Sequence, residues 1–432
     1  MNIWTTESSY PVSFRAEEAT RLGDYLKQRQ SVNLVGMKRV GISNFLRFFL
    51  YHKDIVNKYI NEDEKHLFIS VDLNDLVERE IYPFWTLTLK RVVDSVEASD
   101  LPDAVKKQIG NLFLMSIQSQ DLFLVIDSIR KALLIIVAQG YYPTLFFLRF
   151  DRLQDAFNPS FFDNLEGLRD ATEERLAYVF TSYRSLDFIF PQVKTSLSVF
   201  CQQMYVKPAE EEDMQIVAEA YKKRYHLELS AQLEKELFAC VGGNIQYLQL
   251  ALIVLKEKTQ EVVDPEKLLS FLLADERIAI ESEELWESLQ REEQMILLEV
   301  AKGNGISADD YALASYLWEV GILSGDQESS QVFSPLFASY LASQKQEFSE
   351  KAHAEHLTRK EHLLFSLLQK HMGEICEREQ IIETVWSEYE DFGVSDWAID
   401  RLVARVRLKL REQKSQYEIV TVRTRGYKLV MA

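Results

Sequence analysis

One segment near the amino terminus restricts the fold of this 432-residue chain more than any other. Val32 to Val35 form a short apolar run, the loop Gly36–Ser43 (GMKRVGIS) follows, and apolar residues then recur from Phe45 to Leu50. A short apolar run before a glycine is typical of a buried strand, and the spacing that follows is typical of a buried helix. The order strand, glycine-bounded loop, helix predicts a parallel sheet with helical crossovers.

Further apolar runs predict the rest of this sheet. We expect strands at residues 66–72, 144–150 and 176–182, with a long helical stretch at about 83–139 between the first two. Strands that alternate with helices are typical of a parallel α/β sheet. The predicted α/β domain spans residues 1–205.

Three more segments follow the predicted sheet domain. Residues 206–276 are predicted to be all helical, with two helices separated by Gly242–Asn244. Residues 277–350 have the order helices, strand, turn, strand, which predicts a small winged-helix segment. Residues 355–432 form the last predicted unit, so the chain is expected to be a multidomain protein with α/β and α parts.

The loop Gly36–Ser43 has most features of a phosphate loop. Gly36 and Gly41 are placed as in the pattern G-x-x-x-x-G-K-[ST], and Ser43 is placed to hold Mg²⁺. Backbone N–H groups of such a loop and the helix amino terminus favour anions. Ile42 takes the lysine position, however, and an isoleucine gives no charge to the β- and γ-phosphates. Lys38 or Arg39 is the candidate substitute.

The third predicted strand ends without the expected acids. It reads Leu-Phe-Phe-Leu-Arg-Phe-Asp-Arg-Leu, whereas the strand in AAA+ ATPases, which this region resembles, usually ends in an Asp-Glu pair. One alignment places that pair on Leu148 and Arg149, and the other places it on Asp151 and Arg152. Both lack the acid that orients the attacking water.

Two later motifs extend this resemblance over about residues 15–345. Thr181–Arg184 resembles the polar residues that close the fourth strand of AAA+ proteins, and Gly242–Ile245 resembles a Gly-Gly-x-Pro lid motif with Ile245 in place of proline. The region resembles the signal-transducing, STAND-like branch of AAA+ ATPases. The resemblance implies a RecA-like sheet domain and a helical lid.

We expect this module to be a pseudo-ATPase without significant NTP hydrolysis and without a bound cofactor or metal. The alternative is a module that binds ATP and Mg²⁺. The residues of the degenerate nucleotide site are Gly36, Lys38, Arg39, Gly41, Ile42, Ser43, Asp151 and Arg184.

The last unit has a helix with two chemically different sides, at about residues 395–414. At 100° per residue the apolar residues share one side. These are Ile399, Leu402, Val403, Val406 and Leu410. Trp397, Asp400, Arg401, Ala404, Arg405 and Leu408 lie opposite. Arginines on an outward helix face suit the major groove of DNA.

Two predicted strands, residues 417–422 and 427–430, follow this helix and flank a basic turn. Such a wing is suited to the DNA backbone or the minor groove. The candidate DNA-contacting residues are Trp397, Asp400, Arg401, Arg405, Arg423, Arg425 and Lys428. Asp400 is expected to orient Arg401 or Arg405, or to accept a hydrogen bond from a cytosine amino group.

This unit resembles the OmpR/PhoB-type winged-helix DNA-binding domain. The matching residues are Leu357, Thr358 and Glu361 of the first helix, Arg378, Glu379, Ile381, Val385 and Trp386 of the second, Asp400, Arg405, Arg407, Lys409 and Leu410 of the third, and Thr421, Val422, Arg423, Gly426 and Tyr427 of the wing. Trp397, Leu402 and Thr424 depart from the family pattern. The resemblance implies binding to double-stranded DNA. The alternative is that the arginines are solvated and the unit contacts protein.

The net charge of −18 is unevenly distributed. Residues 355–432 are neutral, and residues 395–432 hold nine Lys and Arg against four Asp and Glu. An acidic body therefore precedes one short basic surface, and we expect it to weaken non-specific DNA binding. Three separated cysteines and the absence of an apolar run of about 20 residues predict a cytoplasmic protein without a membrane helix.

Together these features predict a DNA-binding transcription regulator. Its ATPase-like module would sense a ligand, or a protein partner bound through that module or the lid. Two alternatives are an NTP-binding switch with residual ATPase activity and an interaction scaffold of a defence or mobile-element system. No oligomeric state is predicted.

Overall fold

The computed structural model describes residues 5–61, 63–153, 159–191, 201–257, 264–326, 329–351, 359–385, 396–412, 415, 417–422 and 425–431. The chain divides into two compact units, Met1–Ser343 and Gln344–Ala432. The domain boundaries expected at residues 205, 276 and 350 remain predictions.

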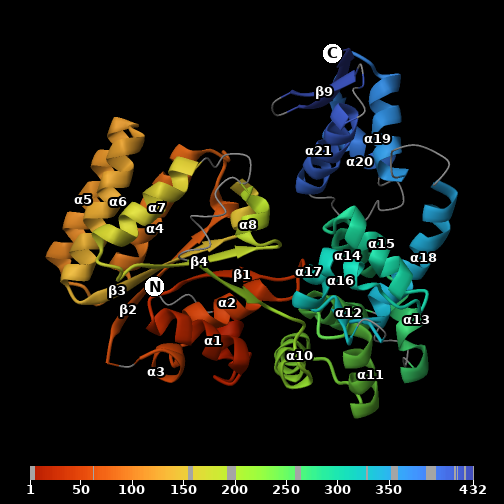
Figure 1. Ribbon diagram of the computed structural model, residues 1–432, viewed down its shortest axis with the longest axis horizontal. Coiled ribbons are helices and arrows are strands. Elements are labelled where there is room, and N and C mark those ends of the chain that lie inside the picture. Colours follow the sequence, from red (N-terminus) through yellow and green to blue (C-terminus); the bar gives the residue numbers. More distant parts are fainter. Residues whose placement is uncertain are drawn as a thin grey trace. The chain divides into compact units, whose positions relative to one another are not determined.

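A five-stranded parallel sheet in the order β2-β3-β4-β1-β5 organises the first unit (Figure 1). Its strands are β1 (Ser31–Val35), β2 (Lys65–Asp72), β3 (Tyr141–Leu148), β4 (Ala177–Ser182) and β5 (Cys201–Tyr205). The four predicted strands are confirmed, and β5 was not predicted. This edge strand exposes Gln202 and Gln203 and buries only Met204, so it lacks an apolar run.

The third strand begins earlier than the sequence suggested. Pro143 was expected in a turn but lies within β3, opposite Leu67 of β2. The pairing with β4 begins only at Thr144, so Pro143 has no β4 partner on that side. A proline is tolerated in a strand where it has no ladder bond to donate.

Helices cover both faces of the sheet, with α1–α3 on one face and α4–α7 on the other (Figure 1). The helices that cover the two faces are α1 (Ala16–Lys27), α2 (Ile42–Tyr51), α3 (Ile55–Tyr59), α4 (Ile81–Glu97), α5 (Asp103–Ser119), α6 (Leu122–Ala138) and α7 (Pro159–Ala171). The short helix α8 (Leu186–Ile189) follows β4. The helical stretch expected at 83–139 is therefore three helices. The second break is set by Asp121, whose side chain caps α6 by accepting a hydrogen bond from the Leu124 N–H at 3.1 Å.

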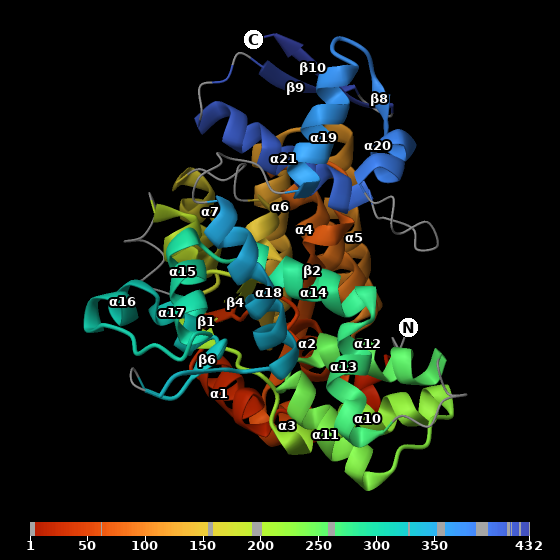
Figure 2. The same ribbon diagram turned by 90° about the vertical axis from the view of Figure 1, so that its right-hand side faces the viewer.

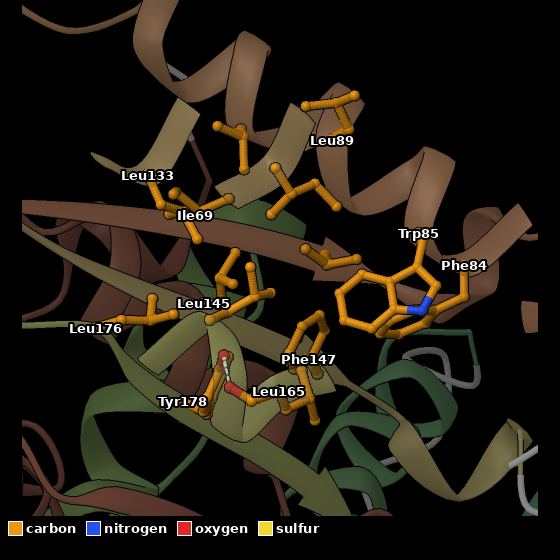
Figure 3. Packing of buried hydrophobic residues seen from close by; sticks show 14 of the residues in the cluster. Ile69, Phe84, Trp85, Leu89, Leu133, Leu145, Phe147, Leu165, Leu176 and Tyr178 are labelled. Carbon is orange, nitrogen blue, oxygen red and sulfur yellow. Dashed lines mark hydrogen bonds between the residues drawn. The ribbon is translucent and has the colours of Figure 1, made fainter. Parts of the chain in front are cut away.

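A group of aromatic side chains lies in the core between the sheet and α4, α6 and α7. Phe84 and Trp85 of α4 meet Phe147 of β3, and all three are fully buried (Figure 3). Tyr178 of β4 donates its hydroxyl hydrogen to the Leu165 carbonyl of α7 at 2.7 Å. Each such ring contributes roughly 1.5–3 kcal/mol by burial, so this core fixes the strand ends that carry the candidate site.

The rest of the first unit is mostly helical. It contains α10 (Glu211–Tyr225), α11 (Ala231–Val241), α12 (Ile245–Glu257), α13 (Leu268–Leu273), α14 (Glu276–Glu287), α15 (Arg291–Val300), α16 (Ala308–Leu313), α17 (Ser315–Glu319), β6 (Leu323–Ser324) and β7 (Gln331–Val332). Helix α18 (Pro335–Lys351) begins in this unit and continues into the second. Residues 242–244 separate α11 from α12 as predicted, and β6 and β7 form the expected antiparallel pair.

The second unit is a winged helix. It contains α19 (Arg359–Lys370), β8 (Cys376–Glu377), α20 (Arg378–Val385), α21 (Asp396–Glu412), β9 (Tyr417–Val422) and β10 (Gly426–Met431). The strands form an antiparallel sheet in the order β8-β10-β9, and the helices pack against it (Figure 2). The predicted helices and wing strands are confirmed, whereas β8 was not predicted. Thr358, Trp386 and Thr424 lie outside the described residues.

The apolar stripe of α21 forms the centre of this unit's core. Ile399, Leu402, Val403, Val406 and Leu410 are all buried, as predicted, together with Leu364 and Leu368 of α19. Across the described parts of both units, no helix combines the length and apolar character that a membrane span requires.

The end of α11 provides a test of the packing in the first unit. Gly242 has φ +57°, and a Cβ atom built there lies 1.9 Å from the Phe333 carbonyl oxygen. We expect Gly242→Ala to lower the free energy of unfolding by about 2–4 kcal/mol, because backbone strain and overpacking add. Gly140→Ala is the matched control, since Gly140 also has positive φ but no atom within 4 Å of the added Cβ. Urea unfolding of the full chain measures both, and equal losses would contradict the close packing at Gly242.

Candidate nucleic-acid interface and phosphate loop

The loop between β1 and α2 has a glycine with positive φ just before α2, and apolar side chains lie close to both of its glycines. Gly41 has φ +112°, and Ile42 begins α2. A Cβ atom built at Gly36 lies 2.9 Å from Cδ1 of Ile42, and one built at Gly41 lies 2.7 Å from Cγ1 of Ile245. The isoleucine at the lysine position therefore packs beside the loop, and the isoleucine of the lid motif packs on it. Ser43 is exposed.

Both cations of the loop are paired with carboxylates from α14. Lys38 is only 2% exposed, and its Nζ lies 2.6 Å from Oε2 of Glu284. Arg39 is partly exposed and places Nη2 at 3.0 Å from Oε2 of Glu284 and Nε at 3.3 Å from Oε2 of Glu281. Glu281 is itself buried, and this burial raises the pKa of its carboxyl to about 7. Both loop cations are thus in contact with carboxyl groups of α14.

A third cation at this edge of the sheet is paired in the same way. Arg184 follows β4 and forms a bidentate pair with Glu293 on α15. Its Nη1 lies 2.6 Å from Oε1 of Glu293, and its Nη2 lies 2.6 Å from Oε2. Its guanidinium also lies 3.7 Å from the ring centroid of Tyr316. Burial alone would lower the pKa of Arg184, but the Glu293 hydrogen bonds raise it. Bidentate pairing in a half-buried site is the strong form of this interaction.

Arg149 directly follows β3. Arg149 has φ +59°, its N–H donates to Oγ1 of Thr181 at 2.7 Å, and its Nη1 lies 2.5 Å from Oδ2 of Asp72. Asp151 follows in a 3₁₀ turn and is half-buried. In the described parts of the chain, no cluster of three or more His, Cys, Asp and Glu side chains is arranged to hold a metal ion.

In the second unit, Asp400 of α21 joins this helix to α20 and to β10 of the wing. Its Oδ1 lies 2.7 Å from Nη2 of Arg378 on α20 and accepts a hydrogen bond from the Tyr427 hydroxyl on β10. Burial, together with Asp400, raises the pKa of Tyr427 to about 12. The described contacts of Asp400 are thus with Arg378 and Tyr427, and the expected roles of Asp400 toward Arg401, Arg405 or a cytosine amino group stay predictions.

Arg405 points toward α19. Its Nε lies 3.3 Å from Oε1 of Glu361, and Nζ of Lys409 lies 2.5 Å from Oε2 of the same carboxylate. Glu361 is only 1% exposed, so both cations compensate a buried charge. Arg405 was expected on the outward side of α21, but it lies at the margin of the apolar stripe, within reach of Glu361.

The remaining predicted contacts divide into exposed and undescribed side chains. Arg425 is exposed at the start of β10, and Lys428 is half-exposed within it. Arg423 lies outside the described residues, as do the side chains of Trp397 and Arg401.

Several residues of both sites were missed by sequence reasoning. Glu281, Glu284 and Glu293 were not singled out, although the three-residue spacing of the first two places them on one face of a helix. Arg411 was also missed. It is exposed, and at 100° per residue it lies on the same side of α21 as Ala404.

Comparison with known proteins gives a family match for the second unit and similar solved structures for a larger part of the chain. Residues 352–429 match the family described as "Transcriptional regulatory protein, C terminal". The second unit is an OmpR/PhoB-type winged-helix domain. This assignment confirms the predicted resemblance, and a domain of this type implies DNA binding.

Solved structures similar to the chain have AAA+ ATPase folds. The Walker-type ATPase of Pyrococcus abyssi has 16% sequence identity and a TM-score of 0.51, and the match covers 78% of this chain and 100% of that chain. The ORC2 protein of Aeropyrum pernix has 14% identity and a TM-score of 0.44, with 79% and 96% of the two chains covered. The first of these two matches confirms the predicted AAA+-like fold, and the STAND-like branch remains a prediction.

Proposed function

We propose that this chain is a DNA-binding transcription regulator. Its second unit contacts duplex DNA, and its AAA+-like unit senses a ligand or protein partner without hydrolysing NTP. The observation that carries the proposal is the OmpR/PhoB-type unit, whose wing strands are paired and whose exposed basic residues include Arg411 and Arg425.

The contacts within the second unit support separate roles for its charged residues. Arg425 and Lys428 lie on the wing, where lysine and arginine side chains suit phosphate contacts. Arg411 is proposed as a further contact on α21, and Trp397, Arg401 and Arg423 stay candidates. Arg405 and Asp400 act mainly by position in this proposal, because Arg405 is paired with Glu361 and Asp400 is paired with Arg378.

A surface of the first unit supports a protein partner. Leu114, Met115, Phe123 and Leu124 are large apolar side chains that are 43–73% exposed around the turn between α5 and α6. Exposed apolar residues that gather in one region are typical of an interaction site. We propose this turn as the partner-binding part of the ATPase-like module.

The DNA proposal predicts a change in the salt dependence of binding. The full chain with Arg425→Ala and Lys428→Ala should bind a random-sequence duplex more weakly, and the slope of log affinity against log salt should fall by about one for each lost phosphate contact. Fluorescence anisotropy with a labelled duplex at several salt concentrations measures this slope. Lys106→Ala with Lys107→Ala, on α5 of the other unit, is the charge-matched control. An unchanged slope in the wing variant would refute the proposed interface.

The proposed lack of hydrolysis predicts no phosphate release above background from ATP and Mg²⁺. It is supported by Ile42 at the lysine position and by Arg149, paired with Asp72, at the end of β3. A steady rate in the wild type that disappears in Ser43→Ala with Asp151→Ala would show an active site and overturn this part of the proposal.

A further inference from the structure

Three cations and three carboxylates face each other where the sheet meets α14 and α15. Lys38 and Arg39 bind Glu284, Arg39 also binds Glu281, and Arg184 binds Glu293. Each carboxylate comes from the segment 281–293, and the cations follow β1 and β4. Among the described contacts of the phosphate loop, α14 therefore supplies the anion.

Because some of these groups are buried, breaking their ion pairs costs free energy. Lys38 is 2% exposed and Glu281 is 4% exposed. A buried charge is costly unless an opposite charge compensates it, so loss of either partner leaves an unfavourable group behind. The loop can give up the glutamates at low cost only if another anion takes their place.

We propose that Glu281 and Glu284 form an anionic latch that competes with a polyphosphate for Lys38 and Arg39. In the latched state, the two carboxylates balance the loop cations and hold α14 against the loop. A polyphosphate gains these cations only when α14 moves away. The inference deepens the proposed function, since it rests on a loop that is part of a sensor and not of a hydrolytic site.

The latch links ligand binding to the next helix. Ser288, whose carbonyl accepts a hydrogen bond from Nη2 of Arg184 at 3.1 Å, lies between α14 and α15. Displacement of α14 therefore strains the Arg184–Glu293 pair. Because the ligand exchanges one anion for another, the two states differ by a small free energy that ligand concentration can shift.

The test measures binding of inorganic pyrophosphate, and separately of ATP with Mg²⁺, to the full chain by isothermal titration calorimetry. Glu281→Gln with Glu284→Gln removes both negative charges of the latch while keeping side-chain size. We expect this variant to bind pyrophosphate at least about tenfold more tightly than the wild type, within the usual range of coupling. Adding Lys38→Ala and Arg39→Ala should abolish this gain in affinity. If the latch variant bound ATP, but not pyrophosphate, more tightly than the wild type, the glutamates would compete with the nucleoside part of ATP. This result would overturn the proposed competition for phosphate.

Glu228→Gln with Glu292→Gln is the charge-matched control, since both glutamates are exposed in the same unit. It should leave the affinity unchanged. If the latch variant does not fold, Glu284→Gln alone is titrated, and it should still show a gain. Equal affinity in wild type and latch variant would overturn the latch. Phosphate release, measured in parallel, reports on hydrolysis and thus tests the proposed function separately.

Discussion

The ion pairs between the carboxyl edge of the sheet and the helices α14 and α15 are the interaction on which the first unit depends. The carboxyl ends of parallel strands meet at one edge, which is where α/β proteins place their ligands. Lys38, Arg39 and Arg184 lie there, and each is paired with a distant glutamate. The partners of Lys38 and Arg39 are more than 240 residues away in the sequence, and the partner of Arg184 is about 110 residues away. These pairs decide the electrostatics of the loop and connect the sheet to the helices that follow.

In the second unit, too, ion pairs and a hydrogen bond connect separate helices and a strand. Asp400 connects α20, α21 and β10, and the buried Glu361 connects α19 to α21 through Arg405 and Lys409. Charged residues of α21 thus connect this helix to α19, α20 and β10.

Local patterns predicted most of the fold because burial produces them. The apolar runs of β1, β2 and β4 and the stripe of α21 were found from the sequence. Strand β5 was missed because it lies at an edge and buries only Met204 fully.

The candidate sites were harder to predict, because their ion pairs connect distant segments. Nothing near Lys38 in the sequence indicates Glu284, since periodicity describes one element and not its partners. Arg405 was misplaced for a similar reason. A helical projection places it near the margin of the outward side, and only the position of Glu361 on another helix shows which way it turns.

Backbone amide hydrogen exchange of the wild-type full chain tests the central claim most directly, because it reports on the loop and on α14 together. Exchange over residues 36–43 and over α14 is compared with and without excess ATP and Mg²⁺. If Glu281 and Glu284 are paired with the loop cations, nucleotide should slow amide exchange in the loop only when α14 loses its protection. While α14 stays protected, exchange in the loop should not change. Slower exchange in the loop with no change in α14 would mean that nucleotide binds beside the glutamates, which contradicts the account.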